Sequence, residues 1–241
     1  MMKKYLLNAI FSVVCLFFCL SCAARVSGSL LADGKADINV YAALEPRITM
    51  LLGTLAAASG MAQQGAPLIN GPSVSASMSA APGVASASLV NKTPSSIEGP
   101  VKISQISDFL AHGKEQGFIS FEQGTPSKDG KCAVNLSRDF GKEILGLLSP
   151  EIGVYLEALM APLATGEKLA KTEYLTLVAS VYGKGIADEI SQAAIQISID
   201  FPGQVRSVRG GTFSGKKAEF SIPLLDLLVL ETPLNYEVAW R

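Results

Sequence analysis

The amino-acid sequence predicts an α+β fold: an antiparallel sheet with helices packed on one face and a helical insertion. Three observations predict this class. Segments in which apolar and polar residues alternate lie near both ends of the chain, which is typical of strands with one buried face. Apolar residues spaced three and four positions apart fill much of residues 138–193, which indicates a block of helices. Glycine and proline separate the segments at short intervals, so strands and helices are joined by short loops.

Residues 1–21 have the features of a lipoprotein signal peptide. Lys3 and Lys4 form a positive start, and an apolar run follows over residues 5–20. This run is shorter than the roughly 20 residues that a membrane span needs. It ends at Ser21-Cys22, and a small residue directly before a cysteine at this place resembles a lipobox, whose cysteine becomes the lipidated first residue of the mature chain.

The chemistry of lipidation explains why a cysteine stands there, because the acceptor of the diacylglyceryl group must be a thiolate. The usual lipobox has leucine three residues before the cysteine, whereas this chain has Cys19 there and Leu20 one place later. Such relaxed boxes resemble those of spirochaete lipoproteins. We therefore expect acylation (palmitate) at Cys22 and anchoring to a membrane of the cell envelope, on the periplasmic side or the cell surface. The alternative is an ordinary signal that is cleaved near Ala23 or Ala24.

Residues 22–241 are expected to form a single α+β domain. Of the 20 basic residues, Lys3 and Lys4 are lost with the signal, which leaves 18 against 21 acidic residues and a net charge of −3. This balance, with no basic stripe, argues against nucleic acid as a partner. Charged residues make up only 17% of the chain, below the roughly 25% that is typical of soluble domains. After lipidation of Cys22, Cys132 is the one remaining thiol, and we expect it to be an unpaired core residue.

The first half of the domain is expected to open with a hairpin around Asp33-Gly34, followed by a helix behind Pro46. An Ala/Ser/Gly-rich segment over residues 61–82 resembles a linker, yet residues 73–80 alternate with period two. That piece is left open as a hairpin strand, a short helix or a disordered segment. The elements expected up to residue 136 are strands at 25–31, 36–43, 84–90, 97–103, 117–121 and 132–136, and helices at 48–58 and 104–112.

The second half is expected to begin with the helical block 138–193 and to end in strands. Alternating isoleucines at 195, 197 and 199 indicate one strand, and residues 217–222 and 234–240 indicate two more. An apolar stretch at 224–230 between them is expected to form a helical turn.

Turn motifs near the C-terminus carry a resemblance to a known family. Residues 197–205 end in Pro202-Gly203-Gln204-Val205, and Gly210-Gly211 and residues 215–220 follow. Together with the early Asp33-Gly34 hairpin, they resemble the LppM-type lipoprotein domain over about a third of the mature chain. The family often has tryptophan where Phe220 stands and often ends in a membrane helix, and residues 138–193 resemble an insertion. The resemblance implies an α+β envelope lipoprotein without known enzymatic activity that can hold an acyl chain.

The residue types that carry catalysis are scarce. His112 is the sole histidine, and with one free cysteine it cannot complete an ordinary zinc site. Asp188 and Glu189 are adjacent on a helix and therefore point to different faces. A single tryptophan, Trp240, offers little for stacking against sugars. We therefore expect no enzyme, no cofactor and no metal site.

The sequence leaves three functions open: a carrier of lipid or another apolar ligand, a structural or assembly lipoprotein that binds another envelope protein, and a host-facing surface antigen. For the carrier, we expect the helical block and the sheet to enclose the ligand. The candidate lining residues are Leu156, Leu159, Leu175 and Val178.

Overall fold

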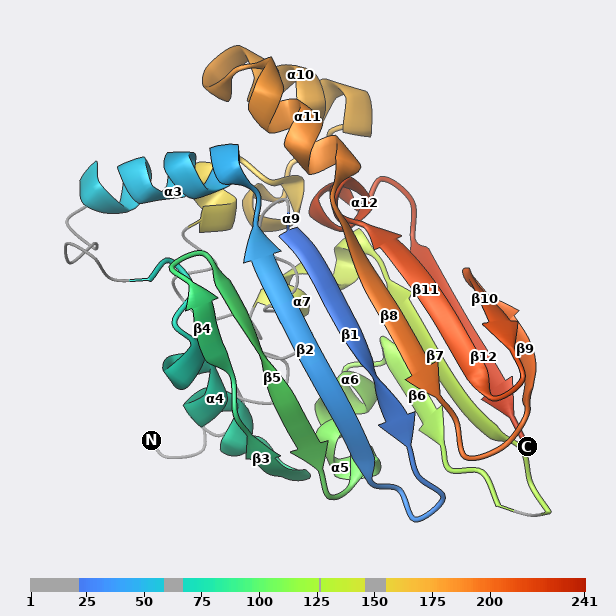
Figure 1. Ribbon diagram of the computed structural model, residues 1–241. Coiled ribbons are helices and arrows are strands. Elements are labelled where there is room, and N and C mark those ends of the chain that lie inside the picture. The colour runs from blue at the N-terminus through green and yellow to red at the C-terminus, as the bar shows by residue number, and fades with distance from the viewer. Residues whose placement is uncertain (1–21, 59–66, 126, 146–154) are drawn as a thin grey trace.

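The computed structural model describes residues 22–58, 67–125, 127–145 and 155–241, and Figure 1 shows two β-sheets with helices gathered at one end and along one side. The predicted signal peptide lies outside the described residues, as do parts of the Ala/Ser/Gly-rich segment and of the helical block. The α+β class predicted from the sequence is confirmed, because most of the strand pairs are antiparallel and helices are interspersed between them.

The larger sheet has eight strands in the order β10-β11-β8-β1-β2-β5-β3, with β4 also paired to β5. Its strands are β1 (Cys22–Leu30), β2 (Ala36–Leu44), β3 (Val84–Ala87), β4 (Val90–Thr93), β5 (Ser96–Ile103), β8 (Ala194–Asp200), β10 (Gly211–Ser214) and β11 (Lys217–Pro223). The predicted Asp33-Gly34 hairpin is present, and Leu31 N donates to Lys35 O across it at 2.8 Å. The first strand lies at the centre of the sheet, antiparallel to β2 and parallel to β8.

The smaller sheet has the order β6-β7-β12-β9. Its strands are β6 (Ile119–Glu122), β7 (Gly130–Leu136), β9 (Val205–Arg209) and β12 (Leu234–Trp240). The chain passes from this sheet to the larger one at Gly210, because β9 pairs with β12 and β10 pairs with β11. Gly210 has φ +77°, and a Cβ there would lie 2.6 Å from the ring of Tyr236, so the corner requires glycine.

The helices described are α3 (Pro46–Ala58), α4 (Gly71–Ser79), α5 (Ile106–Phe109), α6 (Ala111–Glu115), α7 (Gly141–Leu145), α9 (Pro162–Thr165), α10 (Lys171–Tyr182), α11 (Lys184–Gln192) and α12 (Leu224–Val229), with a 3-10 turn η2 (Arg138–Phe140). In Figure 1, α3 and α9–α12 lie at the end of the larger sheet where β1 begins, and α4 lies beside β3 and β4.

Two features of the architecture differ from the expectation. The expectation of a single sheet covered by helices is wrong in part, because a second sheet faces the larger one. An alternating strand shows that one of its faces is buried but not whether helices or strands cover that face, so the pattern could not separate the two cases.

The segment 73–80, for which the sequence left strand, helix and disorder open, belongs to a helix, α4. Asn70 Oδ1 caps it by accepting from Ser73 N at 3.0 Å, and the buried pair Val74 and Met78 is spaced by four residues, which suits period two and a helix alike.

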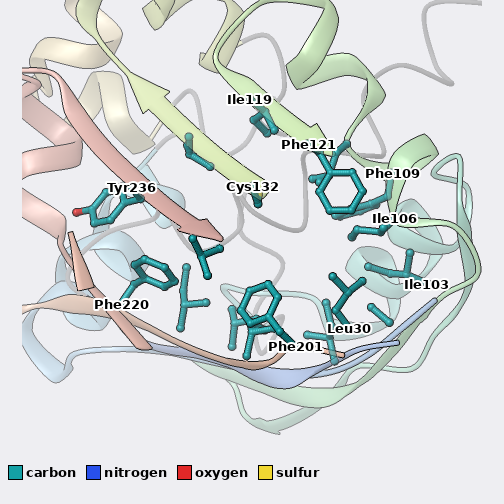
Figure 2. Close-up of a pocket in the computed structure, with 18 of the residues that line it drawn as sticks. Leu30, Ile103, Ile106, Phe109, Ile119, Phe121, Cys132, Phe201, Phe220 and Tyr236 are labelled. Atoms are coloured by element: carbon teal, nitrogen blue, oxygen red, sulfur yellow. The ribbon is translucent and has the colours of Figure 1, made fainter. Parts of the chain in front are cut away.

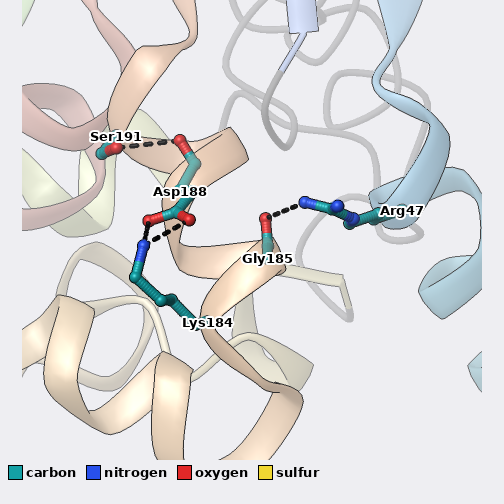
Figure 3. A network of polar contacts seen from close by, with 5 residues as sticks. All are labelled: Arg47, Lys184, Gly185, Asp188 and Ser191. Atoms are coloured by element: carbon teal, nitrogen blue, oxygen red, sulfur yellow. Dashed lines mark hydrogen bonds and ion pairs between the residues drawn. The ribbon is translucent and has the colours of Figure 1, made fainter.

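The two adjacent carboxylates of α11 point in different directions, as the sequence predicts. Asp188 forms an exposed ion pair with Lys184, with the Oδ2 and Nζ atoms 2.6 Å apart (Figure 3). Glu189 instead reaches α3, where its Oε2 accepts from Ile48 N at 3.1 Å and its Oε1 from Arg47 N at 3.3 Å. Arg47 returns a hydrogen bond to Gly185 O, so α3 and α11 are linked at the positive end of α3.

We expect Glu189→Gln to lower the free energy of unfolding by about 1 kcal/mol, because a charged acceptor is lost from backbone N–H groups at the start of α3. Thermal and urea unfolding monitored by circular dichroism measure the change. Asp188→Asn is the matched control, and its effect should stay within about 0.5 kcal/mol because exposed ion pairs contribute little. Equal effects of the two substitutions would contradict the capping role of Glu189.

Candidate functional site

An apolar cavity of about 280 Å³ lies between the two sheets (Figure 2). The larger sheet contributes inward-facing side chains from β1, β2, β5, β8 and β11, and the smaller sheet contributes side chains from β6, β7 and β12. Helices α5 and α12 complete the wall with Ile106, Phe109 and Leu227. The remaining apolar lining residues are Val26, Leu30, Ala36, Ile38, Val101, Ile103, Leu110, Ile119, Phe121, Val134, Leu136, Ile195, Ile197, Ile199, Phe201, Phe220, Ile222 and Val238, together with Cys132.

The central lining residues show that the sheets do not fill the space between them. Val26, Ile38, Ile197 and Ile199 face the opposite sheet rather than the outside, yet each remains only half-buried. Facing sheets normally interdigitate their side chains at crystal-like density, which leaves inward residues almost fully covered. The exposure of these four residues is therefore exposure to the cavity.

Polar groups are confined to the margin of the cavity. The lining includes Ser29, Tyr236 and Glu237, but the Glu237 carboxylate is paired with Lys131 Nζ at 3.1 Å, and Lys131 is not a lining residue. Partial burial raises the pKa of Tyr236, whose ring contacts Phe220 edge-on with centroids 5.9 Å apart. In Figure 2 the Tyr236 hydroxyl points away from the cavity. The interior thus presents almost no partner for a polar ligand group.

Cys132 places its side chain among the apolar residues of the cavity wall (Figure 2). Within the part of the chain that the structure describes, it is a free thiol, as expected from the sequence. Burial raises the pKa of the Cys132 thiol to about 12, so the thiolate is scarce at neutral pH.

We expect alkylation of Cys132 by iodoacetamide at pH 8 to be far slower in the folded protein than in 6 M urea. A rise of the pKa from 9.0 to about 12 leaves roughly 10³-fold less thiolate to react. Because the folded state raises this pKa, the contribution of Cys132 to stability is present below pH 9 and is lost as the pH rises toward 12. Mass spectrometry of timed aliquots measures the rate, and rapid alkylation of folded protein at pH 8 would contradict this burial.

The four lining candidates predicted from the sequence are not among the residues that line this cavity. Leu156, Leu159 and Val178 are fully buried, and Leu175 is half-buried against the same core. The backbone of Leu159 accepts a hydrogen bond from the Tyr174 hydroxyl at 3.2 Å. These side chains belong to the buried core at the helical block, where α11 contacts α10 and where α9, α10 and α11 each contact α12.

Cys22 is the first residue of β1 and pairs with Leu44 of β2, so the predicted lipidation point abuts the sheet without an intervening linker. Within the described residues, no helix has the length and hydropathy to cross a membrane. The same residues contain no cluster of three or more His, Cys, Asp or Glu side chains suited to a metal ion.

Several lining residues could have been found from the sequence. The alternation of the isoleucines at 195, 197 and 199 predicts one apolar face, and all three line the cavity. Val134, Phe220 and Ile222 were missed although their segments alternate, because alternation does not reveal that two such faces oppose each other across a gap.

Comparison with known proteins gives limited similarity. No protein-family model matches the chain, and no curated protein matches it in sequence. Among solved structures, the chain is similar to the NMR structure of the folded domain of LppM from Mycobacterium tuberculosis, with 9% sequence identity and a TM-score of 0.39. The match covers 92% of this chain and 90% of that domain. At this TM-score the two structures differ too much for function to be transferred from one to the other.

Proposed function

We propose that the protein is a membrane-anchored envelope lipoprotein that holds the acyl chain of a lipid between its two sheets and catalyses no reaction. The observation that carries this proposal is the apolar cavity described above, which is formed by inward faces of both sheets. Apolar pockets with few polar groups at the margin are typical binding sites for apolar ligands.

The cavity has the size of a medium acyl chain. An apolar cavity of about 150 Å³ accepts benzene, so about 280 Å³ has room for about ten carbon atoms. Burial of a methylene contributes about 0.8 kcal/mol, which gives roughly 8 kcal/mol for about ten of them before the cost of association. A longer chain would extend beyond the described volume, with its polar headgroup outside.

The predicted anchor supports the same function, because a lipid on Cys22 would keep the domain within reach of membrane lipids. Binding of another envelope protein is the competing function, and it would need a contiguous exposed apolar patch. The large exposed apolar side chains of the described residues are instead distributed over separate segments; they are Leu31, Met50, Val90, Val181 and Phe213.

Native mass spectrometry of the processed protein, purified from its own envelope, tests the proposal. We expect adducts with the mass of a lipid, and the already slow alkylation of Cys132 should slow further when a ten-carbon fatty acid is added. Acyl-chain binding would be refuted if no lipid adducts were found and the fatty acid did not change the alkylation rate of Cys132.

The anchor is tested separately by Cys22→Ser, which removes the thiol acceptor of the lipid. Radioactive palmitate should label the wild type and leave the variant unlabelled. Continued labelling of Cys22→Ser would refute lipidation at this residue. It would not bear on the proposal that the cavity binds an acyl chain.

A further inference from the structure

Helix α3 begins beside the point at which the N-terminal signal segment joins the fold. Cys22 opens β1 and pairs with Leu44 at the end of β2, and α3 starts at Pro46, two residues later. Figure 1 shows α3 leaving the top of β2 and extending past the edge of the larger sheet. Any lipid or apolar segment attached at Cys22 would therefore bring a membrane to the side of the protein that carries α3.

One face of α3 is buried and the opposite face is open. Ile48, Leu52 and Ala56 are spaced by four residues and are almost completely buried. The open face, which we call the outer face of α3, consists of the exposed Met50, Thr54 and Ala57 with the half-buried Gly53, and the exposed Arg47 lies at its N-terminal end. Met50 is 73% exposed, the highest value among the large apolar side chains of the described residues, and a Cβ at Gly53 would contact nothing within 4 Å.

Beyond Arg47, the outer face presents no group that needs water. Residues 48–91 contain no Asp, Glu, Lys or Arg. The Thr54 hydroxyl donates to Met50 O at 2.9 Å, so the helix itself satisfies it. The nearby charges, Glu45, Arg47 and Glu189, lie at the start of the helix, where the Arg47 guanidinium reaches Gly185 O at 3.4 Å and Glu189 accepts from Ile48 N at 3.1 Å.

We infer that the outer face of α3 lies on the membrane surface and contacts lipid directly. An uncharged helix face with satisfied backbone and side-chain polar groups suits the boundary between headgroups and acyl chains. The face is small, but attachment at Cys22 converts its contact with lipid into an intramolecular step, so a modest affinity suffices. This inference rests on the anchored state in the proposed function and is independent of the cavity.

Tryptophan fluorescence in reconstituted vesicles tests this contact. The processed protein carrying Met50→Trp or Ala57→Trp is reconstituted into phosphatidylethanolamine–phosphatidylglycerol vesicles with and without brominated acyl chains. Each spectrum is compared with that of the wild type, whose single Trp240 is buried. Phe213→Trp is the matched control, because Phe213 is an exposed apolar residue on β10, which β11 and β8 separate from β1 in the larger sheet.

Brominated lipids should quench the tryptophans at positions 50 and 57 at least twofold more than the one at position 213. Equal quenching at all three positions, in protein that floats with the vesicles, would refute contact by α3. A blue shift at position 50 without quenching would also refute it, because another protein copy would then cover the face. Failure of the wild type to float with vesicles would instead refute the anchor.

Discussion

Replacing Trp240 by alanine is expected to lower the free energy of unfolding by about 3–5 kcal/mol, as for other buried tryptophans. The side chain is 1% exposed and packs against the tilted rings of Phe201 and Phe121, with ring centroids 4.7 and 6.2 Å away. Both phenylalanines also line the cavity, so Trp240 supports its wall from behind. Denaturant unfolding monitored by circular dichroism measures the loss, and each kcal/mol should lower Tm by about 2–4 °C in a domain of this size.

The neighbouring glycine supplies the control for this packing. A Cβ at Gly130 would lie 2.2 Å from Trp240 Cε2, so Gly130→Ala should overpack the site and cost about 1–3 kcal/mol. Trp240→Phe keeps one aromatic ring and loses the second ring of the indole, whose N–H has no hydrogen-bond partner among the described residues, so it should cost less than Trp240→Ala. Trp240→Phe should also rescue part of the loss from Gly130→Ala. Additive effects of the two substitutions would contradict a direct contact between these residues.

Val26→Phe is expected to weaken binding of a ten-carbon fatty acid roughly tenfold while leaving the fold intact. Val26 is half-buried and faces the cavity, so the larger ring would occupy space that the ligand needs. Loss of about two methylenes from the bound chain corresponds to about 1.6 kcal/mol, which is close to a factor of ten in affinity. Isothermal titration calorimetry measures the affinity.

Val40 is the matched control, because it is the register partner of Val26 across β1 and β2, is 1% exposed and does not line the cavity. Val40→Phe should therefore lower stability by about 1–3 kcal/mol through overpacking. Equal destabilisation by the two substitutions, with no bound fatty acid in the wild type, would show that the space between the sheets is not a binding site.

The strand pattern of the sequence was sufficient for most of the fold. The Asp33-Gly34 turn and the alternation after Ala36 predicted the first hairpin, and Pro46 predicted the start of α3. The expected strand at 84–90 is divided into β3 and β4, each paired with a different part of β5. Local alternation cannot reveal such a division, because the division depends on how the segment pairs with the neighbouring strand β5.

The site was harder to predict because it depends on which apolar faces meet. The leucines of 138–193 and the isoleucines of 195–199 are equally apolar in sequence. Only the isoleucines face a gap, since Leu156 and Leu159 are fully buried in the core. Composition can therefore indicate that apolar surface is in excess, whereas the location of a cavity follows from packing between distant segments.

The parallel pairing of β1 with β8 has a consequence for the order in which the chain can fold. Ala24 pairs with Ile195, so the central strand of the larger sheet finds its second neighbour only after most of the chain is available. Until then the β1–β2 hairpin exposes one unpaired edge, the kind of edge that invites aggregation. Contacts so far apart in sequence also slow folding. A chain delivered N-terminus first would therefore need its early hairpin shielded, by a chaperone or by the membrane, until residue 200 has emerged.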